Sequence, residues 1–207
     1  MKGFDILLTD LDEKLLNTAH AKGVKHVKRF DLLEEVSSPQ AVFDVVVMKS
    51  VQHEFQPEKL KVIHKNIYDL LNKDGIFLEW DVHVESEGQA SWLKKYINLK
   101  DSLAGDIHLV DNRHIYTSQQ VIKNLIDTGF REIRIVYRFH YSISNNKFSE
   151  VYFRTASGEV DENKKEIFYQ ETMKLIQELP QGIRFTDDEK NHDLIFKIPA
   201  VIIKASK

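Results

Sequence analysis

The residues best suited to chemistry in this chain are acids and a histidine that follow apolar runs. Asp10 ends one such run, Asp31 follows a second, and His53 lies shortly after a third. A carboxylate accepts strong hydrogen bonds from ligand hydroxyl or amino groups, and a histidine can take up a proton near neutral pH. Each also has a structural interpretation: Asp10 and Asp12 as helix caps, Asp31 as a turn residue, and His53 as a side chain packed under the next helix.

Strands and helices alternate through the first eighty residues, and this order would position those side chains. The apolar runs predict strands at 4–10, 24–30, 43–48 and 76–81, and helical spacing predicts helices at 13–19 and 57–71. Gly75 is expected to be a left-handed turn residue between the last helix and strand. We therefore predict an α/β fold with a mostly parallel sheet and helices on both faces.

The rest of the chain is less regular. We expect a helix around 91–97, a helix at 118–127 ended by Gly129, and a long strand at 130–141. A strand at 149–154, a charged helix at 161–179 and a last strand at 195–204 follow, with Pro199 marking a sheet edge or a bulge.

Composition narrows the classes of function. The 207 residues suit a single domain, and the net charge of -3 does not suggest a nucleic-acid partner. The absence of cysteine excludes disulfides and thiolate metal sites, and we expect no metal. No signal-peptide pattern and no apolar run of about 20 residues is visible, so we expect a cytoplasmic protein without a membrane partner.

Four segments in order carry a resemblance to a known family. They are residues 8–16, 27–32, 43–55 and 67–77, with a weaker fifth at 116–130. In this order and spacing the chain resembles the class I S-adenosylmethionine-dependent methyltransferases over about residues 4–139. The resemblance implies a Rossmann-like sheet with antiparallel last strands, and one methyltransferase-like domain over 1–207 with insertions at about 84–115 and 142–192.

The resemblance also implies S-adenosylmethionine as cofactor and names residues for its site. Asp10 matches the acid that binds the ribose, and Asp31 the acid that meets the adenine amino group. Leu11, Leu32 and Lys49 are expected to line the same cofactor, with Leu32 beside the adenine ring.

The reaction implied is methyl transfer to a small-molecule acceptor. It needs a base only when the acceptor must lose a proton. His53 lies near the family's reaction centre and is our candidate for that base or for a substrate contact; His83 is a weaker one.

The family's first strand and its Gly-x-Gly-x-Gly loop have no counterpart before Phe4, where Gly3 is the sole glycine. Three explanations stay open. The chain is part of a longer methyltransferase, or one subunit of a split enzyme whose partner chain supplies the strand, or an inactive methyltransferase-like scaffold. A homo-oligomer is a further expectation.

A more distant alternative is a haloacid dehalogenase-like phosphatase. Asp10 and Asp12 resemble that family's nucleophile and acid/base pair, Ser50 its phosphate-binding hydroxyl, and Asp187 with Asp188 its magnesium acids. The expected Gly-Thr after the second aspartate is replaced here by Glu-Lys.

Overall fold

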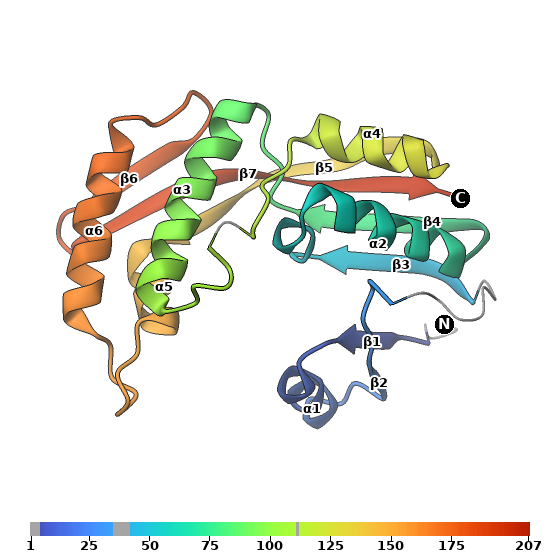
Figure 1. Cartoon of the computed structure of the whole chain (residues 1–207), viewed down its shortest axis with the longest axis horizontal. Helices are drawn as coiled ribbons and strands as arrows, with labels where there is room; N and C mark the ends of the chain where they lie inside the picture. The colour runs from blue at the N-terminus through green and yellow to red at the C-terminus, as the bar shows by residue number, and fades with distance from the viewer. Residues whose placement is uncertain (1–4, 35–41, 111) are drawn as a thin grey trace.

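The computed structural model describes residues 5–34, 42–110 and 112–207. Strands and helices alternate first, and longer strands with a helical layer follow (Figure 1). The elements are β1 Leu7–Asp10, α1 Glu13–Ala21, β2 His26–Arg29, β3 Phe43–Lys49, the 3-10 helix η1 Gln52–Glu54, α2 Pro57–Leu70, β4 Leu71–Asp81, α3 Glu87–Ala104, α4 Ser118–Thr128, β5 Arg131–Ser144, α5 Asn145–Tyr152, α6 Glu162–Ile176, β6 Arg184–Asp188 and β7 Asp193–Ser206.

The strands of the described residues form two sheets. The small sheet pairs β1 with β2 in parallel. The large sheet has the order β3-β4-β7-β5, and β6 also pairs with β7. β3 and β4 are parallel, whereas β7 runs antiparallel to β4, β5 and β6. This arrangement confirms the predicted α/β class with an antiparallel last strand.

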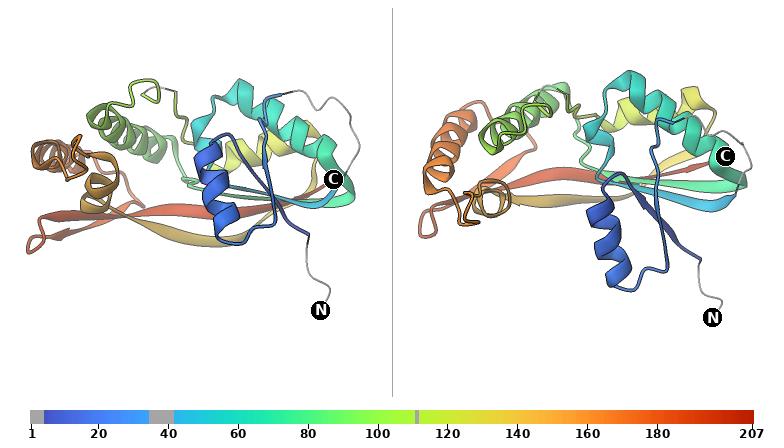
Figure 2. Two further views of the ribbon diagram at one scale, coloured as in Figure 1. Left: turned by 90° about the horizontal axis from the view of Figure 1, so that it is seen from below. Right: turned by 60° about the horizontal axis from the view of Figure 1, so that its bottom comes forward.

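Helices α2 and α4 cover one face of the large sheet, and α1 lies on the opposite side (right-hand view of Figure 2). The face that points away from α2 and α4 carries exposed or half-exposed apolar side chains. Tyr137 is 61% exposed, and the ring centroids of Trp80 and Phe139 lie 5.9 Å apart.

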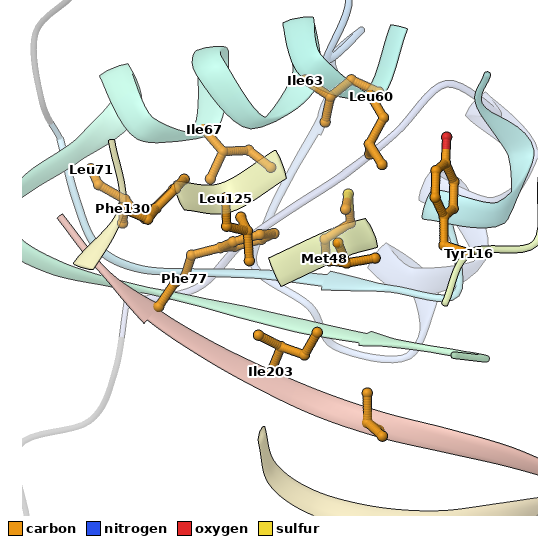
Figure 3. Packing of buried hydrophobic residues seen from close by; sticks show 13 residues of the cluster. Met48, Leu60, Ile63, Ile67, Leu71, Phe77, Tyr116, Leu125, Phe130 and Ile203 are labelled. Carbon is orange, nitrogen blue, oxygen red and sulfur yellow. The ribbon is translucent and has the colours of Figure 1, made fainter. Parts of the chain in front are cut away.

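Two hydrophobic cores stabilise the chain. The first core lies beneath α2 and α4 and includes Leu60, Ile63, Phe77 and Leu125, all fully buried (Figure 3). The second core lies beneath α3 and α6, with Tyr96 at its centre. The 14-residue strands β5 and β7 extend along both. None of the helices among the described residues has both the length and the apolar character needed to cross a membrane.

Two local predictions were wrong, and a third was confirmed with different bounds. The strand expected at 149–154 is replaced by helix α5, which Ser144 caps by accepting a hydrogen bond from the Lys147 backbone N–H. The left-handed residue in this part of the chain is Asp74, which lies within β4 and has φ 64°, and not Gly75. The helix expected around 91–97 is confirmed, but α3 is longer, with 18 residues, because its buried positions continue beyond that short apolar stretch.

Pro199 lies inside the long strand β7, where a break in the neighbouring strands accommodates it. On one side of β7, β6 pairs with residues up to Lys197, and β4 pairs from Val201 onward. Pro199 falls between these two partners and faces His140 of β5 on the other side. The edge-like environment predicted for this proline is therefore a gap between two strands that share one side of β7.

Candidate functional site

The carboxyl ends of β1 and β3 point toward the same side of the molecule (Figure 1). Because β2 is parallel to β1 and β4 is parallel to β3, the ends of all four strands face this side. In open α/β sheets, ligands bind at the carboxyl ends of the strands. The predicted site residues follow these ends, with Asp10 closing β1, Asp31 after β2, and Lys49 and His53 closing and following β3.

Asp10 and Asp12 accept different backbone hydrogen bonds in the turn that leads into α1. One Asp10 carboxylate oxygen accepts a hydrogen bond from the Asp12 backbone N–H at 2.9 Å. Asp12 caps α1 by accepting from the Lys14 N–H at 2.7 Å. The second carboxylate oxygen of Asp10 has no hydrogen bond with a residue that the structure describes, so it can accept one from a ligand hydroxyl. Leu11, between them, is 46% exposed.

Asp31 repeats this arrangement after β2. One of its carboxylate oxygens accepts a hydrogen bond from the Leu33 N–H at 2.8 Å. The Asn66 amide of α2 donates to the Leu32 carbonyl at 2.8 Å, which ties this turn to the first core. The pairing of Asp10 with Arg29 in the parallel register places Asp31 two residues past the matching position. The two carboxylates thus follow neighbouring strands, each with one oxygen held by a backbone turn.

Lys49, at the end of β3, lies over the indole of Trp80. Its ammonium is 4.3 Å from the ring centroid. A cation in this position is stabilised by the electron-rich face of the ring. Lys49 is exposed and lies on the open face of the large sheet.

His53 forms a close pair with Asp81, which ends β4. The His53 Nδ1 lies 2.9 Å and 3.1 Å from the two carboxylate oxygens of Asp81. The backbone N–H of His53 also donates to this carboxylate, at 3.3 Å. The chain reaches this position through Ser50, which adopts a left-handed conformation with φ 55°. A non-glycine residue in that region of backbone space carries strain and is often found at functional sites.

Burial and pairing give the two members of this pair different environments. The side chain of Asp81 is 2% exposed and that of His53 is 23% exposed. Burial raises the pKa of Asp81, but the hydrogen bond and the charge of His53, helped by the Val82 backbone N–H, lower it below its usual value. Asp81 is therefore ionised at neutral pH and accepts the Nδ1 proton of His53. In the neutral tautomer that carries its proton on Nδ1, the Nε2 atom of His53 holds the lone pair.

A second group of polar side chains lies fully buried behind this pair. Glu79 has its carboxylate oxygens 3.5 Å from His83 Nε2 and 3.8 Å from His64 Nε2. Burial, followed by the charge of His83, lowers the pKa of His64 to about 3, and burial raises the pKa of Glu79. Both shifts favour the neutral forms. His83 is 1% exposed, so the weaker catalytic candidate has a buried environment.

Asp81 is the site residue that the sequence interpretation missed. Its signal was present, because an acid that closes an apolar strand at 76–81 follows the same rule that selected Asp10 and Asp31. What the sequence did not show is that the chain after β3 folds back over the end of β4. The structure also separates the acids of the phosphatase alternative: Asp187 and Asp188 lie in β6, far from β1 (Figure 1). The described residues contain no cluster of histidines and acids able to hold a metal.

Comparison with known proteins finds similarity at the level of structure. No protein-family model matches the chain, and no curated protein matches it. The YcgJ protein from Bacillus subtilis superposes with a TM-score of 0.72 at 12% identity, covering 97% of this chain and 81% of that one. A putative methyltransferase from Bacillus halodurans gives a TM-score of 0.67 at 19% identity, with 97% and 82% covered.

A SAM-dependent methyltransferase from Archaeoglobus fulgidus is also similar. Its TM-score is 0.53 at 15% identity, covering 97% of this chain and 75% of that one. At these identities the similarity establishes the fold and not the activity. The chain thus has a mixed α/β fold with a central sheet, the Rossmann-like fold of its methyltransferase neighbours.

Proposed function

We propose that this chain forms the catalytic part of an S-adenosylmethionine-dependent methyltransferase that acts on a small-molecule acceptor. The observation that carries the proposal is the His53–Asp81 pair at the carboxyl ends of β3 and β4, on the same side as Asp10 and Asp31. Structural neighbours that are described as methyltransferases support the same assignment. When bound, S-adenosylmethionine supplies a methyl group on a positively charged sulfur that is its own leaving group.

The nucleoside half of this cofactor fits the residues at the ends of β1 and β2. A ribose offers two neighbouring hydroxyl groups, and Asp10 offers a carboxylate oxygen with no hydrogen-bond partner among the described residues. A hydrogen bond from a neutral hydroxyl to a carboxylate is stronger than one between neutral groups. Asp31 offers the same kind of oxygen for the adenine amino group, and Leu32, Leu11 and Lys49 would border the cofactor.

His53 would remove a proton from the acceptor, with Asp81 as its positioning residue. Asp81 lies 2.9 Å and 3.1 Å from Nδ1, so the proton of the neutral imidazole would sit on Nδ1 and Nε2 would be the nitrogen that accepts the proton of the acceptor. Positive charge that develops on the ring is then compensated by the buried carboxylate. An acceptor hydroxyl or amine that must lose a proton therefore suits this site better than one that need not.

The proposal is tested by titrating S-adenosylmethionine into the full chain by calorimetry. We expect saturable binding that Asp10→Asn weakens about tenfold, because the amide keeps the turn bond but loses the charge that strengthens the hydroxyl contacts. Asp127→Asn is the matched control, since Asp127 lies on the exposed surface of α4 in an ion pair with Lys123 and should leave affinity unchanged.

Two results would oppose the proposal. Equal affinity for the Asp10→Asn variant and the unchanged chain would remove Asp10 from the cofactor site. Complete absence of binding to the full chain would favour the catalytically inactive scaffold.

A further inference from the structure

A row of charged side chains leads from the end of α3 to the turn that carries His53. The Asp101 carboxylate accepts a hydrogen bond from Arg113 Nε at 2.7 Å. The Lys100 ammonium lies 2.5 Å from the other oxygen of that carboxylate. Nη1 of Arg113 in turn lies 3.5 Å from the Glu54 carboxylate. Glu54 is the last residue of η1 and directly follows His53, so the row ends one residue from the proposed base.

Three of the four charged side chains in this row are buried. Lys100 is 3% exposed, Asp101 0% and Arg113 8%, and the exposed end of the row is Glu54. Buried charges require partners, and here one carboxylate serves two cations. The Lys100 ammonium also lies 4.0 Å from the centroid of the Tyr152 ring in α5, a position that stabilises a desolvated cation. These contacts hold the Arg113 guanidinium from its buried side.

η1 depends on neighbouring segments for its position. It has three residues, and Val51 before it has no polar side-chain atom with which to cap it. A 3-10 helix also has poorer hydrogen-bond geometry than an α-helix. Asp81 holds the ring of His53, so the remaining question is what holds the backbone that carries the ring.

The segment that contains Arg113 lies beside η1 and holds this backbone. The backbone N–H of His114 donates to the His53 carbonyl at 2.9 Å. The Tyr116 hydroxyl donates to the Phe55 carbonyl at 2.8 Å. Together with the Arg113 contact to Glu54, these bonds join three consecutive residues of the turn to the segment after α3.

An arginine suits this place because its guanidinium has donors in fixed directions. Nε of Arg113 serves Asp101 on α3, and Nη1 serves Glu54 on η1. A lysine ammonium is a compact point charge on a flexible stem and does not hold two carboxylates in these directions. The side chain thus connects a buried anchor to the turn of the proposed base.

We propose that Arg113 is a positioning residue for His53, and that Asp101 is the buried acid that holds Arg113 in place. Arg113 acts through Glu54 and the backbone, whereas Asp81 acts on the imidazole itself. Its role in catalysis rests on the proposed function, because the direction of Nε2 matters for proton removal from an acceptor. A small misplacement of a reacting group lowers the rate. The positioning itself can be measured on His53 without cofactor or acceptor.

The experiment follows the Nδ1–H of His53 by nitrogen-15 NMR of the full chain at low temperature. This proton exchanges with water when the contact with Asp81 opens. We expect Arg113→Lys to speed the exchange at least about tenfold, because lysine loses one of the two carboxylates. Asp101→Asn should act in the same direction, since the amide leaves two buried cations without a carboxylate.

Variants at the exposed end of the row separate positioning from stability. Glu54→Ala removes the contact with Arg113 at a half-exposed position and should speed the exchange while urea unfolding stays unchanged. Glu54→Gln keeps an oxygen that accepts from Nη1 and should restore slow exchange. Glu178→Ala is the matched control, because Glu178 is also exposed and pairs with a cation of another element, Lys95 of α3; it should leave the exchange unchanged.

A second control addresses the buried end. Asp193→Asn alters another buried acid, which accepts hydrogen bonds from the Ser144 hydroxyl and the Asn146 backbone N–H. It should lower stability and leave the His53 exchange rate unchanged. Once an acceptor is found, Arg113→Lys should lower kcat and leave KM within about twofold, because the base and not the binding of substrate is affected.

The inference is overturned if folded Arg113→Lys and Glu54→Ala proteins exchange the His53 proton at the original rate. It is also overturned if Asp193→Asn speeds the exchange as much as Asp101→Asn, since loss of stability alone would then explain the effect. Faster exchange in the Arg113 and Glu54 variants of a chain that binds no S-adenosylmethionine would support the positioning and count against the proposed function.

Discussion

At the scale of single residues, the contact with Asp81 gives the His53 ring a defined orientation, which packing under a helix alone would not. His53 was predicted as a base or as a side chain under the next helix, and its burial is only partial, at 23% exposure. Its Nδ1 lies within hydrogen-bond distance of both oxygens of a buried carboxylate. This geometry selects one ring nitrogen for the carboxylate and the other for solvent or a ligand.

The substitution Asp81→Asn tests this assignment without knowledge of the acceptor. The amide can donate to Nδ1, so we expect His53 to shift from the tautomer protonated at Nδ1 to the one protonated at Nε2. Nitrogen-15 NMR of the imidazole at neutral pH measures this change directly. Once an acceptor is found, the same variant should lose about 10²-fold to 10⁴-fold in turnover, as expected when a base is held in the wrong tautomer.

The Asp127→Asn variant serves again as a control, because it removes a carboxylate from an exposed ion pair and should leave the His53 signals unchanged. An Asp81→Asn protein that folds and keeps the original tautomer would show that Asp81 does not orient His53.

At the scale of elements, the ends of the helices were the most readable features of the sequence. Thr117 begins α4 with a reciprocal pair of hydrogen bonds to Gln120, and Gly129 ends it with φ 109°. The predicted helix at 118–127 matches this element within one residue. Only glycine adopts such a positive φ without steric cost, so Gly129 sets the turn from α4 into β5.

Gly129→Ala should therefore destabilise the chain by about 1 kcal/mol, as expected for forcing an L-residue into the left-handed region. Its new methyl group would lie 3.7 Å from the Tyr68 ring, an ordinary contact, so the cost is conformational and not steric. Urea unfolding measures the change.

Gly88→Ala is the matched comparison, and we expect it to change the free energy of unfolding in the opposite direction. Gly88 lies in the first turn of α3, and its nearest neighbour to an added methyl group is the Ser86 hydroxyl at 3.8 Å. Alanine there should stabilise the chain by about 0.4–1 kcal/mol by restricting the unfolded state. If both variants shifted stability in the same direction, the left-handed conformation at Gly129 would not be the deciding factor.

At the scale of the whole molecule, two hydrophobic cores share two long strands. Leu125 lies in the first core and Phe168 in the second, and each is fully buried. β7 contributes Ile203 to the first core and Phe196 to the second. Because β7 also pairs with β4, β5 and β6, disruption of either core should loosen the strand that supports the other.

We expect the chain to unfold in one common transition. Leu125→Ala and Phe168→Ala should each lower its free energy of unfolding by about 3 kcal/mol or more. Far-ultraviolet circular dichroism and tryptophan fluorescence follow it together, since Trp80 lies on β4, the strand that contributes Phe77 to the first core, and Trp92 lies in the second core. Two separate transitions, each lowered by one variant alone, would instead show that the cores fold independently.

The sequence by itself determined the α/β class, most element positions and the acids at the strand ends. These features are local: an apolar run, a cap such as Asp12 or a glycine such as Gly129 acts on its immediate neighbours. The same reasoning failed at 149–154, where tertiary packing favours a helix. The site residues Asp10, Leu11, Asp31, Leu32 and Lys49 remain predictions as cofactor contacts.

The tertiary structure alone decided which residues meet. His53 and Asp81 are 28 residues apart, and their contact depends on how the turn after β3 crosses the end of β4. The separation of β1 from β3, with a hollow between them, likewise depends on strand pairing across long sequence distances. Pairing of this kind is fixed by the combined packing of many residues, and no short segment of the sequence carries it.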